Sequence, residues 1–152
     1  MRMLPLALAA LMISTSACKA QPASQDPAAF MAQNAKAEGV QTLPSGVEYK
    51  VVKSGPGTSR HPTPNDYVTV NYEGSLLNGQ VFDSSYKTGR SPTFQLKALI
   101  PGWIDAVQQM KEGDEWIVWV PPALGYGAEQ SGPIPGNSVL VFKLELVSIL
   151  GG

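Results

Sequence analysis

The 152-residue chain contains one cysteine, Cys18, and one histidine, His61. A lone cysteine forms no internal disulfide, and a structural zinc site needs four Cys or His ligands. His61 lies among turn residues, where we expect it to be exposed to solvent with no second ligand nearby. The sequence therefore predicts no metal and no cofactor, and a mature domain that needs no thiol protection in an oxidising compartment.

An excess of charge of one sign is also lacking. Lys and Arg number 11 against 12 Asp and Glu, and the chain has no basic block. Proteins that bind nucleic acid carry a basic patch or stripe. Nucleic acid is therefore not an expected partner.

The apolar run at residues 4–13 is too short for a membrane-spanning helix, which needs about 20 residues. It follows Arg2 and precedes a patch of small residues, the pattern of a secretion signal that is removed on maturation. The patch ends in Thr-Ser-Ala-Cys, which we interpret as a lipobox whose Cys18 carries the lipid. Alternatively, Cys18 is an incidental thiol in a signal cut after Ala20. We expect residues 1–18 to be a signal peptide of lipoprotein type, on a protein that is periplasmic or lipid-anchored at the cell envelope.

Residues 19–42 are interpreted as a tether with one short helix. Asp26 and Pro27 predict the start of this helix, because Asp caps helix N-termini and Pro fits the first turn. Gly39 predicts its end. Residues 43–152 are expected to form one folded domain, in which the many glycines and prolines (15 and 13 in the whole chain) indicate frequent turns.

Within this domain the pattern is mainly that of strands. Six strands are predicted, at 47–51, 67–77, 80–84, 94–96, 115–120 and 139–150, and the alternation of apolar and polar residues is clearest at 47–51, 67–72 and 139–150. Asn78-Gly79 predicts a two-residue hairpin loop, and residues 85–92 and 121–136 are expected loops. Pro101 predicts the start of a helix that ends at Gly113. The fold class is therefore α+β, with an antiparallel sheet of five to six strands and one short helix.

Aromatic and large apolar residues stand beside Gly or Pro turns in four segments between residues 72 and 142. No His–carboxylate pair, Cys cluster or phosphate-binding loop accompanies them. A site built from these segments would be apolar and would supply little acid–base chemistry. This pattern is typical of few enzymes.

Three of the segments, VNYEGSLLNGQVFDSSYKTG, IPGW and LVFKLEL, resemble the FKBP family of peptidyl-prolyl cis–trans isomerases, and most closely its secreted bacterial, macrophage-infectivity-potentiator-like branch. The resemblance covers residues 43–150 and implies a bent antiparallel sheet wrapped around one short helix. It also implies an apolar pocket lined by Tyr72, Phe82, Asp83, Leu99, Ile100, Trp103, Tyr126, Ile134 and Phe142. Macrolide inhibitors of the rapamycin type are further implied ligands.

The resemblance implies roles for these residues. Asp83 and Tyr126 would be the catalytic polar groups, and the other seven would bind the substrate, with Trp103 as the pocket floor. Without the resemblance, Trp103 and its aromatic neighbours would more often be core residues, and Asp83 a turn cap.

Other features depart from the family pattern. Thr93 stands where many members carry an aromatic pocket wall, and Gly136 replaces a common proline. The long helical dimerisation arm of the infectivity-potentiator type is absent, which favours a monomer.

The resemblance implies an isomerase that accelerates rotation of X–Pro bonds in folding envelope or secreted proteins. A second hypothesis is a chaperone or scaffold module that binds proline-containing segments, with incidental turnover. A third is a receptor for a hydrophobic small molecule. The presence of Asp83, Trp103 and Tyr126 favours the first.

Overall fold

The structure is a computed structural model, and it describes residues 26–56 and 60–152. The predicted signal peptide, and Cys18 with it, lies outside the described residues. In chain order the elements are α1 (Pro27–Asn34), β1 (Val40–Thr42), β2 (Glu48–Lys53), β3 (Tyr67–Leu76), β4 (Val81–Ser84), α2 (Ser85–Thr88), β5 (Thr93–Gln95), the 3-10 turn η1 (Leu96–Ala98), α3 (Pro101–Val107), β6 (Glu115–Val120), the 3-10 turn η2 (Pro122–Leu124) and β7 (Leu140–Leu150).

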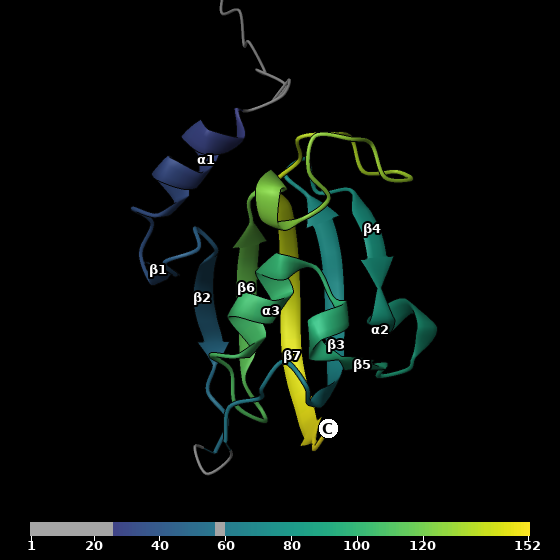
Figure 1. Cartoon of the computed structure of the whole chain (residues 1–152). Helices are drawn as coiled ribbons and strands as arrows, with labels where there is room; N and C mark the ends of the chain where they lie inside the picture. The colour runs from purple at the N-terminus through teal and green to yellow at the C-terminus, as the bar shows by residue number, and fades with distance from the viewer. Residues whose placement is uncertain (1–25, 57–59) are drawn as a thin grey trace, which may run out of the picture.

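The strands of the described residues form one antiparallel sheet of seven strands in the order β1-β2-β6-β7-β3-β4, and β5 pairs with β3 (Figure 1). The α+β fold class is therefore confirmed, although the sheet has more strands than the five or six expected. The additional strand is β1, which is only three residues long and begins at Val40, before the expected start of the domain at residue 43. Long β7 lies between β6 and β3 at the centre of the sheet.

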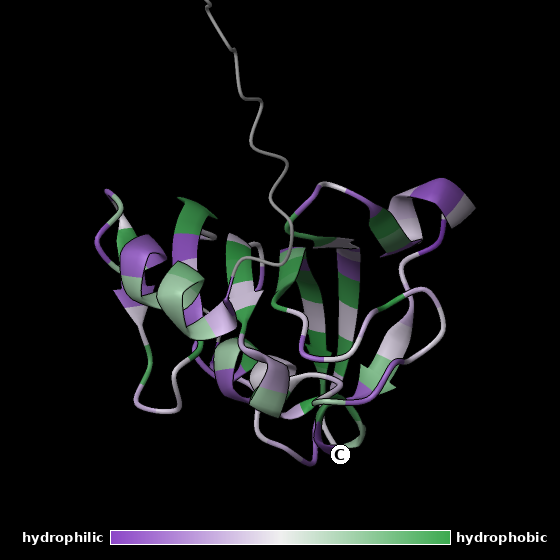
Figure 2. Ribbon diagram, turned by 90° about the horizontal axis from the view of Figure 1, so that it is seen from above, coloured by the Kyte–Doolittle hydropathy of each residue, from purple (hydrophilic) through white to green (hydrophobic). Residues whose placement is uncertain are grey.

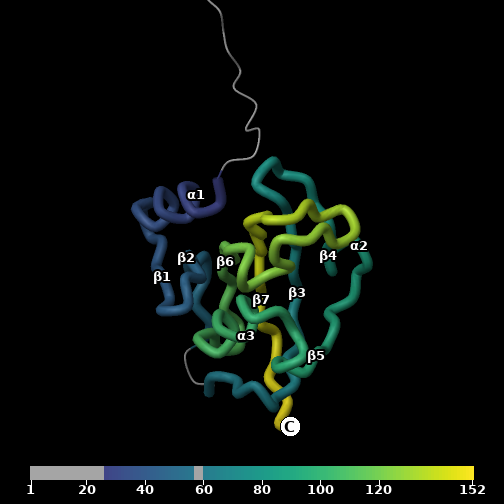
Figure 3. Tube along the Cα trace, turned by 45° about the horizontal axis from the view of Figure 1, so that its top comes forward, coloured from purple at the N-terminus to yellow at the C-terminus, as the bar shows by residue number. Residues whose placement is uncertain are grey.

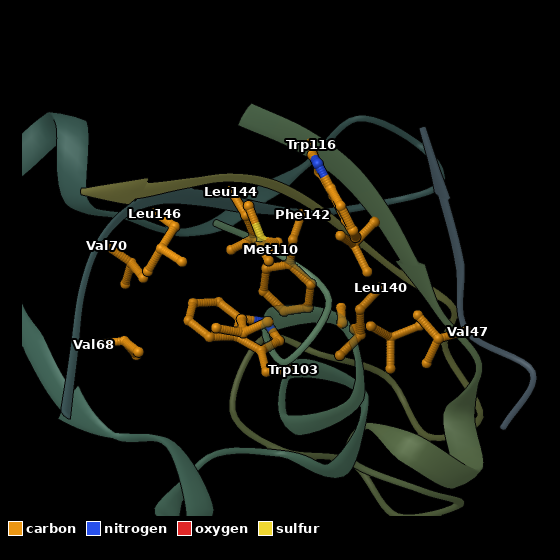
Figure 4. Close-up of a cluster of buried hydrophobic side chains, with 14 of the residues drawn as sticks. Val47, Val68, Val70, Trp103, Met110, Trp116, Leu140, Phe142, Leu144 and Leu146 are labelled. Atoms are coloured by element: carbon orange, nitrogen blue, oxygen red, sulfur yellow. The ribbon is translucent and has the colours of Figure 1, made fainter. Parts of the chain in front are cut away.

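The hydrophobic core lies between α3 and one face of the sheet (Figure 1). Alternate residues of β6 are buried on this face, and they are Trp116, Val118 and Val120. Seen from above, the strands carry the alternation of hydrophobic and hydrophilic residues that a sheet with one buried face requires (Figure 2). Trp103 of α3 and Phe142 of β7 meet within this cluster (Figure 4).

The turns and helix ends differ in detail from those predicted. The N–H of Leu76 donates to the carbonyl of Gln80, so residues 77–79 form a three-residue turn inside this hydrogen bond, and Gly79 takes the left-handed conformation (φ 88°). The expected loop at 85–92 begins with a single helical turn, α2. The helix α3 ends at Val107, well before Gly113, which lies in the following turn.

Strand β2 contradicts the expected alternation. The alternation at residues 47–51 predicts Val47 and Val51 on the buried face and Glu48 in solvent. Val47 is buried as expected, yet Glu48 is only 1% exposed and Val51 is 37% exposed. Glu48 pairs with Thr42 of β1 and Trp119 of β6, and lies close to Asn34 of α1. Val51 lies beyond the end of β1, whose pairing stops at Lys50, so no neighbouring strand covers it on that side.

The helix α1 begins as predicted. The Asp26 carboxylate caps it by accepting a hydrogen bond from the N–H of Ala29 (3.2 Å). The helix ends at Asn34, before the predicted stop at Gly39. It lies beside β1 and β2, whereas the segment 121–139 runs toward β4 (Figure 3). Within residues 26–56 and 60–152, no helix is long and apolar enough to cross a membrane.

Candidate functional site: an aromatic pocket

A cavity of about 220 Å³ opens between α3, the β3–β4 hairpin and the segment after η2. It is smaller than the roughly 300–1,000 Å³ of typical small-molecule sites, and therefore suits one ring-sized group. Its lining includes every predicted site residue except Ile134, and it also includes Phe94, which was not predicted. The lining residues are Tyr72, Phe82, Asp83, Phe94, Leu99, Ile100, Trp103, Tyr126 and Phe142.

Trp103 lies among the most buried of these residues, with 5% of its surface exposed. Pro101 begins α3, and a Cβ atom on Gly102 would lie 2.5 Å from Cγ1 of Val120, so glycine lets the helix approach β6 closely. The Trp103 ring makes edge contacts with Tyr72 (5.1 Å, 79°) and Phe142 (5.2 Å, 90°). Trp103 is therefore both a core residue and a pocket residue.

The neighbours Phe82 and Asp83 both line the pocket, which strict alternation along β4 would forbid. The pairing of β3 with β4 explains this, because Gly74 faces Asp83 while the next residue, Ser75, faces Val81. Phe82 is thus the extra residue of a β-bulge. Bulges re-aim side chains, often beside active sites, and this one gives the pocket an apolar wall and a carboxylate from consecutive positions.

The polar groups of the pocket are few and linked. The Tyr72 hydroxyl donates to Asp83 (2.6 Å). Burial, followed by the hydrogen bond to Asp83 and its negative charge, raises the pKa of Tyr72 above its usual value, so the phenol stays protonated at physiological pH. The Ser85 hydroxyl accepts a hydrogen bond from the Tyr72 N–H (2.8 Å) and holds this part of β3 in place.

Two further hydrogen-bonding groups belong to residues of the pocket lining and have no partner among the described residues. They are the backbone N–H of Ile100, which precedes α3, and the hydroxyl of Tyr126, which is 45% exposed. The Tyr126 loop is closed by hydrogen bonds from the Gly127 N–H to the Pro122 carbonyl and from the Asn137 N–H to the Gly127 carbonyl (both 2.8 Å). Both groups are therefore available to a bound polypeptide.

The loop 121–139 also explains one departure from the family pattern. A Cβ atom on Gly136 would lie 2.2 Å from the carbonyl oxygen of Ala128. A proline at this position, like any residue with a Cβ, would push the two parts of the loop apart. The close approach of residues 128 and 136 in this loop therefore requires glycine at position 136.

The comparison with known families and proteins agrees with this geometry. Residues 58–147 match the family model described as FKBP-type peptidyl-prolyl cis-trans isomerase, and residues 7–51 match a domain amino terminal to that isomerase. The chain is 52% identical to the peptidyl-prolyl cis-trans isomerase Mip of Coxiella burnetii over 123 residues, which cover 80% of this chain and 52% of that protein. It is 44% identical over 122 residues to the outer membrane protein MIP of Legionella longbeachae.

The chain belongs to the FKBP-type isomerase family. The crystal structure of FkpA from Escherichia coli matches with a TM-score of 0.77 and 37% identity over 82% of this chain and 58% of that one. A peptidyl-prolyl cis-trans isomerase from Pseudomonas syringae matches with a TM-score of 0.75 and 34% identity over 82% of this chain and 90% of that one. The chain spans about half the length of the curated relatives it matches.

The lining of this FKBP-type pocket differs from the prediction at two residues: Phe94 belongs to it and Ile134 does not. Thr93 is exposed, and its hydroxyl lies 2.8 Å from that of Thr69, while the next residue, Phe94, lines the cavity instead. The pairing of β5 with β3 aligns Phe94 with buried Val68, and this alignment between strands is not visible in the pattern of either strand alone. Ile134 is 5% exposed and belongs to the core, outside the pocket lining.

A larger cleft of about 450 Å³ lies elsewhere, between the start of α1, the tip of the β3–β4 hairpin and residues 135–139. It contains no aromatic side chain. The smaller cavity gathers the aromatic residues and the free polar groups, and we take it as the functional site on that ground. Among the residues that the structure describes, no three His, Cys, Asp or Glu side chains are grouped as metal ligands.

Proposed function

We propose that the chain is a peptidyl-prolyl cis–trans isomerase that acts on proline-containing segments of other polypeptides. The observation that carries the proposal is a small aromatic cavity of about 220 Å³, whose lining residues Ile100 and Tyr126 have an N–H and an O–H group without a partner in the described part of the chain. Relatives that carry the isomerase name support it. The likeness covers only part of the length of these relatives, so the activity is a proposal for this chain.

The physics of the reaction suits such a pocket. Rotation about an X–Pro bond crosses a barrier of about 18–20 kcal/mol, because the twisted amide loses its resonance. The twisted state needs no nucleophile and no proton donor, and it is less dipolar than the planar amide. An apolar enclosure therefore favours it over the ground state, and each tenfold gain in rate requires about 1.4 kcal/mol of this preference.

The residues then have separate tasks. Trp103, Phe82 and Phe142 enclose the proline ring, while Leu99 and Ile100 line one edge. The Ile100 N–H and the Tyr126 hydroxyl hold substrate carbonyl groups. Asp83 fixes the Tyr72 hydroxyl through their 2.6 Å hydrogen bond and places negative charge beside the rotating carbonyl.

The experiment is a protease-coupled assay of a short X–Pro peptide, with and without a macrolide inhibitor. We expect inhibitable turnover by the wild type and a loss of about tenfold or more in kcat/KM for Phe142→Leu. The matched control is Val141→Ala, because Val141 neighbours Phe142 on β7 but is not part of the pocket lining. A folded wild type without turnover would favour the chaperone or scaffold hypothesis instead.

Location is a separate proposal. The Thr-Ser-Ala-Cys sequence and the apolar run before it support export and lipid attachment at Cys18, which would hold the domain at the envelope. Expression of the full chain in a lipoprotein-processing bacterium, followed by membrane fractionation, tests this. Cys18→Ala should move the protein from the membrane fraction to the soluble fraction, and unchanged fractionation would contradict the anchor.

A further inference from the structure

Gly74 lies at the point where three parts of the pocket meet. It is a buried residue of β3 that pairs with Asp83 of β4 on one side and with Phe142 of β7 on the other. The bulge that turns Phe82 into the pocket begins directly after this pair. The glycine is therefore next to both aromatic walls and to the carboxylate, although it is not among the residues that line the aromatic pocket.

The rings of Phe82 and Phe142 occupy the space that a side chain on residue 74 would need. A Cβ atom there would lie 2.7 Å from Cζ of Phe82 and 2.8 Å from Cε1 of Phe142, closer than real Cβ contacts. The two rings meet edge to face over this position, with centroids 5.8 Å apart (88°). Gly74 has no left-handed backbone requirement, so the reason for glycine is space.

We propose that Gly74 is a positioning residue of the isomerase pocket, where the missing side chain lets Phe82 and Phe142 seat deeply enough to form its walls. The inference rests on the proposed isomerase function. A methyl group at this position would push one or both rings into the cavity and displace the bulge that carries Asp83. The Tyr72–Asp83 hydrogen bond would then change with it, since Tyr72 is two residues from Gly74 on the same strand.

The test is a set of variants of the chain measured for kcat/KM on an X–Pro peptide and for thermal unfolding. The variants are Gly74→Ala, Phe82→Leu and the double variant Gly74→Ala/Phe82→Leu. The control Val70→Ile adds one methylene on the same strand at a buried position outside the pocket lining. It reports the effect of overpacking β3 alone.

We expect Gly74→Ala to lower kcat/KM by about tenfold or more, and Val70→Ile to stay within about threefold of the wild type. Replacing the Phe82 ring by leucine frees the space that a methyl group at position 74 needs. It relieves the contact with Phe82 directly and the contact with Phe142 because that ring can move into the vacated space. The double variant should therefore stay within about threefold of Phe82→Leu alone, and this comparison decides the matter even if Gly74→Ala does not fold.

Three results would overturn the proposal. They are a Gly74→Ala variant as active as the wild type, losses that multiply in the double variant, or a double variant that fails to fold while Phe82→Leu folds. An inactive wild type would instead refute the underlying isomerase function, so the two failures are distinguishable.

Discussion

Replacement of Glu48 by glutamine should stabilise the protein at neutral pH. Glu48 is 1% exposed, and neither of its carboxylate oxygens has a hydrogen bond of normal geometry. Burial raises its pKa, and the nearby Asn34 amide lowers it by a smaller amount. Glutamine keeps the volume and an acceptor for Asn34 but removes the buried charge. Both side chains leave buried polar atoms without partners, but only ionised glutamate adds the desolvation cost of a charge. We therefore expect the free energy of unfolding at pH 7 to rise by about 1 kcal/mol, or Tm by roughly 4 °C.

The gain should depend on pH in a definite direction. The stability associated with a raised carboxyl pKa is fully present below the ordinary glutamate value and is lost as pH rises through the folded-state value. The difference in Tm between Glu48→Gln and the wild type should therefore be small near pH 4 and grow toward pH 7. Differential scanning calorimetry across this range measures it.

The exposed Glu129→Gln variant is the matched control and should show no such trend. A Glu48→Gln variant that is less stable than the wild type at pH 7, or a gap that does not change with pH, would refute the reasoning.

The remaining predictions concern the C-terminus and the pocket. Asp66 accepts hydrogen bonds from the Thr63 N–H (2.7 Å) and the Gly152 N–H (3.3 Å) and pairs with Arg60, which chiefly lowers its pKa. Asp66→Asn should lower Tm at pH 7, and the difference should shrink as pH falls below the ordinary aspartate value. Trp103→Ala should lower the free energy of unfolding, measured by denaturant titration, by about 3–5 kcal/mol. Trp103→Phe should lower it far less, because phenylalanine keeps a ring at this position and removes a buried N–H that has no partner among the described residues. Tyr72→Phe should lower kcat/KM by about threefold to tenfold in the peptide assay while the fold, followed by circular dichroism, is retained.

Much of the pocket could be predicted from the sequence because its residues stand in short local motifs. Trp103 follows a Pro-Gly helix start, and Phe82-Asp83 follows a hairpin turn, so each motif defines its own neighbourhood. The order of these motifs resembles one family. The structure then brings them together as the resemblance implied.

The features that were missed depend on how distant strands align. The bulge at Phe82 arises from the pairing of β4 with β3, and Phe94 enters the pocket because β5 aligns it with Val68. Glu48 is buried by α1, β1 and β6, none of which its own strand pattern can anticipate. Local alternation describes one strand, whereas these outcomes belong to the register between strands and to tertiary contacts.

The most direct test of the central claim is exchange NMR of an X–Pro peptide with a small, substoichiometric amount of the protein. An isomerase accelerates cis-to-trans and trans-to-cis exchange equally and leaves the ratio of the two isomers unchanged. We predict this result, together with its loss in Phe142→Leu. Unchanged exchange rates, with an isomer ratio that shifts only when the protein is stoichiometric with the peptide, would contradict catalysis and indicate a binding module.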